Sequence, residues 1–161
     1  MSLLVLFDID GTLLLSSRQG ARAMQEAGQE VVGEDFTLAG VEFAGRLDPL
    51  ILADGLRALG LDGVDSIESA FREAYARILA RRLAEPGTAY ALAGVPALLA
   101  RLRSRPGTTL GLLTGNYPET GTLKLQAAGL DPTTFEIPVW GTDGATRRDL
   151  PPVALRRFLE R

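Results

Sequence analysis

A short apolar run that leads directly into two carboxylates constrains the fold of this chain more than any other feature. Residues 3–7, Leu-Leu-Val-Leu-Phe, are followed at once by Asp8-Ile9-Asp10-Gly11-Thr12. An unbroken apolar run that ends in a turn signal is typical of a strand buried on both faces of a parallel sheet. Ligands bind at the carboxyl ends of such strands, so we expect Asp8 and Asp10 to lie in a binding site.

The composition narrows the chemistry that this site can perform. The chain has 161 residues, a formal net charge of −3, no cysteine and no histidine. The length predicts one domain, with or without an insertion, and the charge does not favour a nucleic-acid partner. Thiolate chemistry, Ser-His-Asp catalysis and histidine metal ligation are excluded. The apolar run is too short for a membrane span and lacks the cationic flank of a signal peptide, so we expect a cytoplasmic protein.

The sequence between residues 16 and 87 is predicted to be helical. Apolar residues recur at helical spacing over residues 18–31, and Asp48-Pro49 has the pattern of an N-cap followed by proline in a helix that stops at Gly60. A helical segment directly after the first strand is an insertion, which either only adds stability or covers the active site. We favour a cap over the active site, because the segment follows the two acids.

The α/β pattern returns after the insertion. An apolar strand over residues 109–114 is followed by a helix that starts at Pro118 and ends at Gly129. Alternating apolar residues between positions 135 and 139 predict a weak third strand. The sequence therefore predicts a parallel sheet interrupted by a helical insertion.

Asp8 and Asp10 can supply two kinds of chemistry from one small volume. Two nearby carboxylates suit Mg²⁺, and an ionised aspartate can act as a nucleophile while a second acid transfers protons. Gly11 permits close backbone approach to a ligand, and N–H groups at such a turn bind anions. The simpler interpretation is a pair of solvated turn residues, because Asp-Gly is common in turns.

Two further groups of polar residues are candidates for the same site as Asp8 and Asp10. Thr114-Gly115-Asn116 ends the second strand and starts a helix, a place that suits phosphate oxygens, although for this motif alone helix capping is the better explanation. Lys124 is the single lysine in a chain whose other basic residues are all arginine, which indicates a site that needs a compact ammonium. A solvated helix position is the alternative for Lys124. Together the signals predict phosphoryl transfer.

Three motifs in this order resemble the haloacid dehalogenase-like (HAD) hydrolase superfamily, most closely its phosphoglycolate-phosphatase-like branch. The motifs are Asp-Ile-Asp-Gly-Thr-Leu at residues 8–13, Leu-Leu-Thr-Gly-Asn at 112–116 and Lys-Leu-Gln-Ala-Ala-Gly-Leu at 124–130. The resemblance covers most of the chain and implies an α/β fold, a Rossmann-like parallel sheet with an inserted helical cap. On that basis we expect residues 1–15 and 88–161 to form the hydrolase core and residues 16–87 the cap.

The resemblance also implies roles for the residues at matching positions. Asp8 would be the nucleophile and a Mg²⁺ ligand, and Asp10 the general acid and base, with its backbone carbonyl on the metal. Thr114 would bind the transferring phosphate, and Lys124 would hold the phosphate and Asp8 in place. The other expected phosphate-binding residues are Gly11, Thr12, Gly115 and Asn116.

Arg46 is a candidate substrate contact in the predicted cap. Ala44-Gly45-Arg46-Leu47-Asp48 resembles the Gly-Arg-Thr-Asp cap element of the branch, which makes Arg46 a candidate for binding a second anionic group. An arginine that forms a salt bridge with a cap acid such as Asp48 is the alternative.

The superfamily has a fourth acidic motif that we do not find. Asp143 and Asp149 are the nearest candidates, but we interpret residues 151–161 as the last crossover helix, after which the acid-bearing strand should follow. That strand would lie beside residues 3–7, which would otherwise form an exposed apolar edge. We therefore expect that the C-terminal part of the core is missing and that the natural protein continues beyond Arg161.

These observations predict a Mg²⁺-dependent phosphatase that hydrolyses a small, phosphoglycolate-like metabolite through an aspartyl-phosphate intermediate. The alternatives are a phosphomutase of the same superfamily and a truncated or non-catalytic protein of the same fold with an incomplete metal site. We expect no nucleic-acid or membrane partner. The substrate and the oligomeric state, including a homodimer, stay open, because motifs do not determine them.

Overall fold

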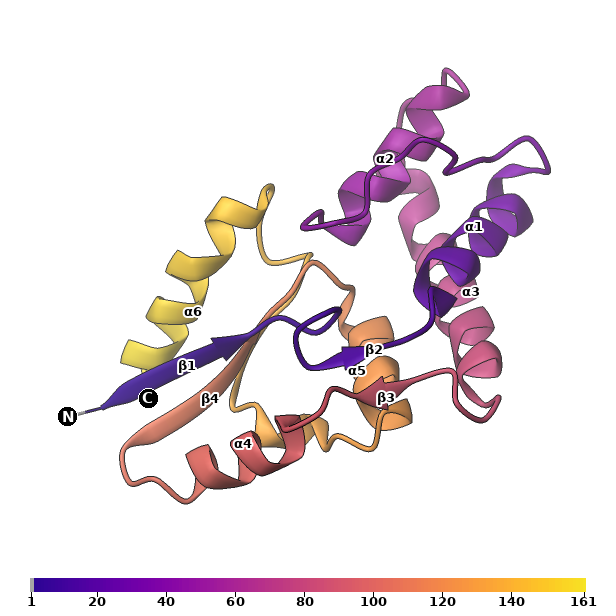
Figure 1. Cartoon of the computed structure of the whole chain (residues 1–161). Coiled ribbons are helices and arrows are strands. Elements are labelled where there is room, and N and C mark those ends of the chain that lie inside the picture. Colours follow the sequence, from indigo (N-terminus) through magenta and orange to yellow (C-terminus); the bar gives the residue numbers. More distant parts are fainter. Residues whose placement is uncertain (1) are drawn as a thin grey trace.

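The computed structural model describes residues 2–161, apart from the side chain of Asp65. The molecule has two parts (Figure 1). Residues 2–15 and 88–161 form a layered α/β part, and three helices lie beside it between residues 16 and 87. We call this second part the helical insertion.

The main sheet has three parallel strands in the order β1-β4-β5. These are β1 (Leu3–Phe7), β4 (Thr108–Leu113) and β5 (Ile137–Val139). In the register, Leu3 lies opposite Thr108 and Phe7 opposite Leu112, so β1 and β4 end together. The predicted parallel sheet is confirmed, and its carboxyl edge brings the polar residues that follow each strand side by side.

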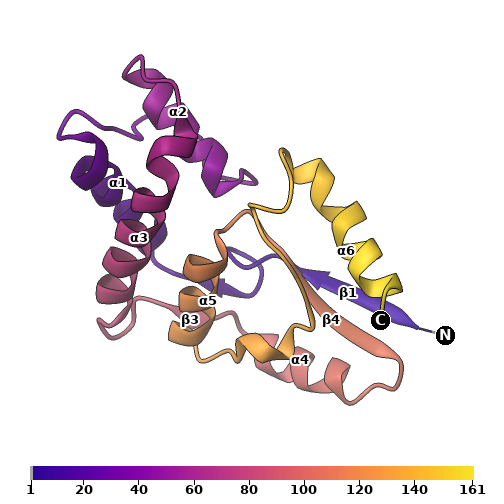
Figure 2. The ribbon, with the colours of Figure 1, turned by 180° about the vertical axis from the view of Figure 1, so that it is seen from behind.

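Helices cover both faces of this sheet (Figures 1 and 2). On one face α4 (Val95–Arg103) and α5 (Pro118–Ala127) pack with β4 around Leu110, Leu112 and Leu125. On the other face lies α6 (Leu150–Leu159), which packs on β5. No helix among the described residues combines the length and the apolar character that a bilayer span requires.

One edge of β1 has no strand beside it. Within residues 2–161, β1 pairs with β4 only, and Leu3 at its start is 40% exposed. The alternating side chains of β1 pack against both cores, Val5 and Phe7 on one face and Leu4 and Leu6 on the other. The strand is therefore covered on both faces but open along its edge, as the sequence analysis expected.

The helical insertion has a hydrophobic core of its own. It contains α1 (Gln19–Val32), α2 (Asp48–Ala58) and α3 (Val64–Leu83), with α1 packed along α3. Its buried side chains include Met24 and Phe71. Two antiparallel strands of two residues each join the two ends of the insertion. They are β2 (Leu14–Leu15) and β3 (Tyr90–Ala91). The sequence analysis did not predict this pair.

Candidate active site

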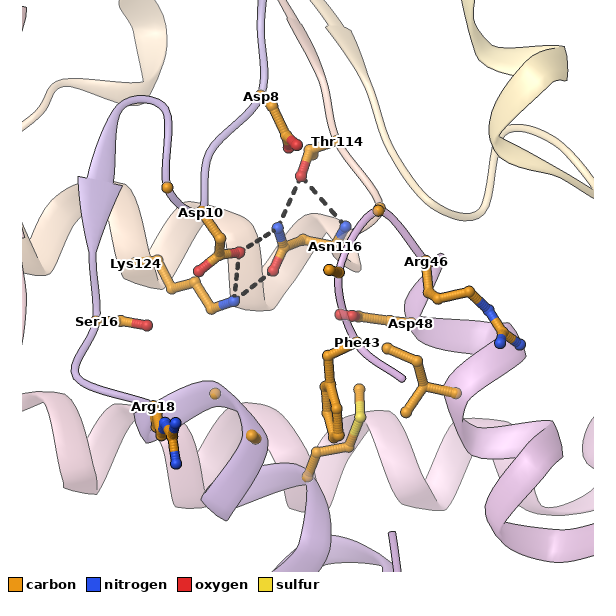
Figure 3. A pocket seen from close by; sticks show the side chains of 18 of the residues that line it. Asp8, Asp10, Ser16, Arg18, Phe43, Arg46, Asp48, Thr114, Asn116 and Lys124 are labelled. Atoms are coloured by element: carbon orange, nitrogen blue, oxygen red, sulfur yellow. Dashed lines mark hydrogen bonds and ion pairs between the residues drawn. The ribbon is translucent and has the colours of Figure 1, made fainter. Parts of the chain in front are cut away.

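A cavity of about 420 Å³ lies between the carboxyl edge of the sheet and the helical insertion (Figure 3). It has two walls, one from each part of the molecule. Most of the expected site residues line it: Asp8, Asp10, Gly11, Arg46, Thr114, Gly115, Asn116 and Lys124. Thr12 is exposed and is not part of the lining, so its phosphate-binding role stays a prediction.

Asp8 directly follows β1 and is held by an arginine. Its Oδ1 accepts a hydrogen bond from the N–H of Ile9 at 2.8 Å, and its Oδ2 lies 2.6 Å from Nη2 of Arg147. Arg147 starts a short 3₁₀ helix, Arg147–Asp149, after β5. The Asp8 side chain remains 30% exposed and lines the cavity, so a ligand can reach it.

Asp10, Asn116 and Lys124 form a closed hydrogen-bonded triangle (Figure 3). Nζ of Lys124 donates to Oδ2 of Asp10 at 2.8 Å and to Oδ1 of Asn116 at 2.6 Å. Nδ2 of Asn116 donates to the same Oδ2 of Asp10 at 2.9 Å. Desolvation acts to raise the pKa of Asp10, but the positive charge of Lys124 and these hydrogen bonds outweigh it and hold the pKa below its usual value.

The position of Lys124 differs from the expectation in one respect. Its side chain is only 6% exposed, so it is not a solvated surface lysine. The resemblance implies that it holds Asp8, but the structure places its Nζ against Oδ2 of Asp10 (Figure 3). Arg147, which the sequence analysis did not single out, is the cation on Asp8.

Thr114 and Asn116 lie side by side on the α/β wall of the cavity. Thr114 is fully buried, and its Oγ1 accepts hydrogen bonds from Nδ2 and N of Asn116 at 2.7 and 3.3 Å. These bonds occupy the acceptor side of the hydroxyl and leave its hydrogen free to turn toward the cavity. Thr114 can therefore donate to an anionic oxygen there.

Gly115 is the point where the two walls touch. The N–H of Asp48 in the insertion donates to its carbonyl oxygen at 2.7 Å. A Cβ at Gly115 would lie 2.0 Å from the carbonyl oxygen of Arg46, so only glycine permits this approach.

Asp48 is buried and does not cap its own helix, which corrects the sequence-based prediction. Leu47 occupies the N-cap of α2, which has no side-chain cap bond, and Oδ2 of Asp48 instead accepts from the N–H of Tyr117 at 3.0 Å. Tyr117 is the N-cap residue of α5, so the carboxylate serves the start of a helix in the other part of the molecule. Burial raises the pKa of Asp48 to about 6, although the charge of Lys124 opposes the rise.

Arg46 forms an ion pair within the insertion. Its Nη2 lies 2.5 Å from Oδ2 of Asp54, which also pairs with Arg57. The alternative interpretation, a salt bridge to an acid of the insertion, is therefore correct, with Asp54 in place of Asp48. Arg46 also lines the cavity, and a contact with substrate stays a prediction.

The donor set at Asp8 fits a cation that keeps most of its ligands as water. Among the described residues no group of three or more acidic side chains gathers to hold a metal ion. Asp8 supplies one carboxylate, and Oδ2 of Asp10 accepts from both Lys124 and Asn116. Mg²⁺ commonly binds through one or two carboxylates together with water and substrate phosphate, so this set suits Mg²⁺ better than a metal that needs a full protein cage.

Solved structures of known proteins share this fold. The chain is similar to a hydrolase from Pseudomonas syringae, with 23% identity, a TM-score of 0.67 and coverage of 98% of this chain and 70% of that one. It is similar to CbbY from Rhodobacter sphaeroides in complex with phosphate, with 22% identity, a TM-score of 0.72 and coverage of 98% and 73%. A predicted phosphoglycolate phosphatase from Haemophilus somnus matches with 18% identity, a TM-score of 0.56 and coverage of 90% and 64%.

Sequence comparison identifies the family. No curated protein matches the chain significantly. The family model of the haloacid dehalogenase-like hydrolases, however, matches residues 3–160, which include both walls of the cavity. The match, the parallel sheet and the two acids at the end of β1 agree with the motifs found in the sequence, and the chain belongs to the haloacid dehalogenase-like hydrolase family.

Proposed function

We propose that this protein is a phosphatase that hydrolyses a small phosphorylated metabolite through a phosphoryl group carried on Asp8. One observation supports this most: the cavity holds two aspartates whose carboxylates have different hydrogen-bond and ion-pair partners. Oδ2 of Asp8 is paired with Arg147 and Oδ1 with the N–H of Ile9, whereas Oδ2 of Asp10 accepts from both Lys124 and Asn116, and both side chains line the cavity. A nucleophile and a separate proton carrier are what a two-step hydrolysis needs.

The α/β wall offers positive charge and donors to a phosphoryl group beside Asp8. The guanidinium of Arg147 is paired with Asp8. The buried hydroxyl of Thr114 lies close to Asp8 (Figure 3). Such donors stabilise the charge on the oxygens of a transferring phosphoryl group. A carboxylate oxygen of Asp8 attacks phosphorus, and the bond from phosphorus to the ester oxygen breaks.

Asp10 can carry the proton through both steps. In the second step water attacks phosphorus, the bond from phosphorus to the Asp8 oxygen breaks to release phosphate, and Asp10 takes the proton that the water loses. In the next turnover Asp10 gives this proton to the departing ester oxygen. Lys124 and Asn116 hold the pKa of Asp10 low, which favours the ionised carboxylate that accepts the proton in the second step.

Mg²⁺ is part of this proposal. Asp8 and the backbone carbonyl of Asp10 would hold the ion, and when bound it would neutralise charge on the phosphoryl oxygens. Similarity to CbbY in complex with phosphate and to a predicted phosphoglycolate phosphatase supports a phosphorylated substrate.

The test is hydrolysis of p-nitrophenyl phosphate with Mg²⁺ by the wild type, Asp8→Asn and the control Asp35→Asn, whose side chain is exposed and outside the cavity. We expect Asp8→Asn to lower kcat by about 10³ or more, because the amide is not a nucleophile, and Asp35→Asn to match the wild type. Turnover by Asp8→Asn at the wild-type rate would refute Asp8 as the nucleophile.

A second candidate is a protein that binds phosphorylated metabolites without turnover. It is favoured by the lack of a third acid near Asp8 among the described residues. Phosphate binding to the wild type without hydrolysis of any phosphate ester would support this candidate over the phosphatase.

A further inference from the structure

The cavity has a cation on its far side that the proposed reaction does not use. Arg18 immediately precedes α1 and lines the same cavity as Asp8. In Figure 3 it lies beyond Ser16, at the opposite end of the view from Asp8 and Thr114. A group bound at Arg18 would therefore be separate from a phosphoryl group at Asp8.

Arg18 differs from the other cations of the cavity in its partners. Arg147 pairs with Asp8, Lys124 with Asp10, and Arg46 with Asp54. By contrast, no carboxylate of the described residues lies within 4.0 Å of the Arg18 guanidinium. Arg18 therefore brings an uncompensated positive charge to the cavity.

The backbone at this point is also unusual. Ser17 and Arg18 have φ values of 47° and 61°, and they are the non-glycine residues with positive φ in the part of the chain that the structure describes. The left-handed region is unfavourable for both residue types, and strained positions of this kind cluster at ligand sites. A glycine would relieve the strain but would also remove the cation from the cavity.

We propose that Arg18 binds a second anionic group of the substrate, so that the substrate is a small metabolite with anionic groups at both ends. Its phosphate ester lies at Asp8, which rests on the proposed function, and a carboxylate or second phosphate lies at Arg18. The cavity, about 420 Å³, has the size of a site for a small molecule. Arg46, which is held in an ion pair with Asp54, contributes less to this recognition.

The experiment measures binding, so it does not depend on turnover. Three phosphonates that cannot be hydrolysed as esters are titrated calorimetrically into the full chain: methylphosphonate, phosphonoacetate and propane-1,3-diphosphonate. We expect the wild type to bind one of the two doubly functional probes at least about tenfold more tightly than methylphosphonate, since a charge-assisted hydrogen bond contributes that much. Preference for phosphonoacetate would indicate a carboxylate at Arg18, and preference for the diphosphonate a second phosphate.

Arg18→Gln should remove this preference while leaving the affinity for methylphosphonate unchanged. Arg22→Gln is the matched control, because Arg22 is exposed on the same helix, carries the same charge and does not line the cavity. The inference is overturned if the wild type shows no preference, if none of the phosphonates binds, or if Arg18→Gln retains the preference. If Arg18→Gln loses the preference but the wild type hydrolyses no ester, only the phosphatase proposal fails.

Discussion

The two walls of the cavity are built differently. On the α/β wall the charged side chains are bonded to one another: Asp10 to Lys124 and Asn116, and Asp8 to Arg147. On the insertion wall Arg18 has no carboxylate partner among the described residues. Groups that act on a reacting atom must be held within fractions of an ångström, whereas groups that select a substrate can be ordered when it binds. This difference is the reason why we propose chemistry for the α/β wall and substrate selection for the insertion wall.

The largest expected effect tests the α/β wall, whose charged side chains are bonded to one another. Lys124→Met keeps an unbranched side chain but leaves Asp10 and Asn116 without their shared cation. We expect the free energy of unfolding at pH 7.5 to fall by about 3 kcal/mol, at the low end for a broken buried pair because Asp10 keeps 45% of its side chain exposed. Urea denaturation measures the change.

The matched variant on the insertion wall is Arg46→Gln. The ion pair of Arg46 with Asp54 is partly exposed on both sides, at 33% and 24%. Its loss should lower the free energy of unfolding by only about 0.5 kcal/mol. Equal effects of Lys124→Met and Arg46→Gln would remove the contrast between the walls.

An effect smaller than that of Lys124→Met, and of opposite sign, is expected where the walls meet, at Asp48. Its pKa is about 6 in the folded protein against 3.8 unfolded, so the folded state holds the proton more tightly. The stability that the folded protein gains from binding this proton is fully present below about pH 4 and is lost as the pH rises through 6. Above pH 6 the buried carboxylate is charged, and Asp48→Asn should raise the free energy of unfolding by about 2 kcal/mol, somewhat less than the pKa shift implies, because the amide N–H₂ also needs a partner.

The measurement is urea denaturation of the wild type and Asp48→Asn at pH 4 and pH 7.5. The two proteins should be similar at pH 4 and differ at pH 7.5, and the exposed Asp35→Asn should follow the wild type at both. A destabilised Asp48→Asn at pH 7.5 would mean that the charged carboxylate is needed on the N–H of Tyr117.

The sequence predicts the α/β wall well, for a local reason. Asp8 and Thr114 each follow an apolar strand, and parallel strands end at one edge, so the site follows from the strand pattern. Arg147 has no such signal, since arginine is common in this chain and its approach to Asp8 depends on the path taken after β5. Its position soon after β5 is the one feature of the sequence that indicates a place in the site.

Tertiary contacts account for the other differences. Asp48-Pro49 has a good local capping pattern, but the N–H of Tyr117, 69 residues away, takes the carboxylate instead. The strands β2 and β3 have two residues each, which is too short for an alternating pattern. They form because the two ends of the insertion meet there.

The last expected effect tests whether the strained backbone at Arg18 lowers the stability of the insertion wall. Arg18→Gly places a residue suited to φ 61° in the left-handed position and should raise the free energy of unfolding by about 1 kcal/mol. Arg22→Gly, a few residues on within α1, should lower it by about 1 kcal/mol, because its backbone is helical. Urea denaturation compares both variants with the wild type. If both glycine variants are destabilised equally, the backbone at Arg18 is not strained and gives no reason to assign Arg18 a ligand. If Arg18→Gly is stabilised while Arg22→Gly is destabilised, glycine is the more stable residue at position 18, although the chain carries an arginine there.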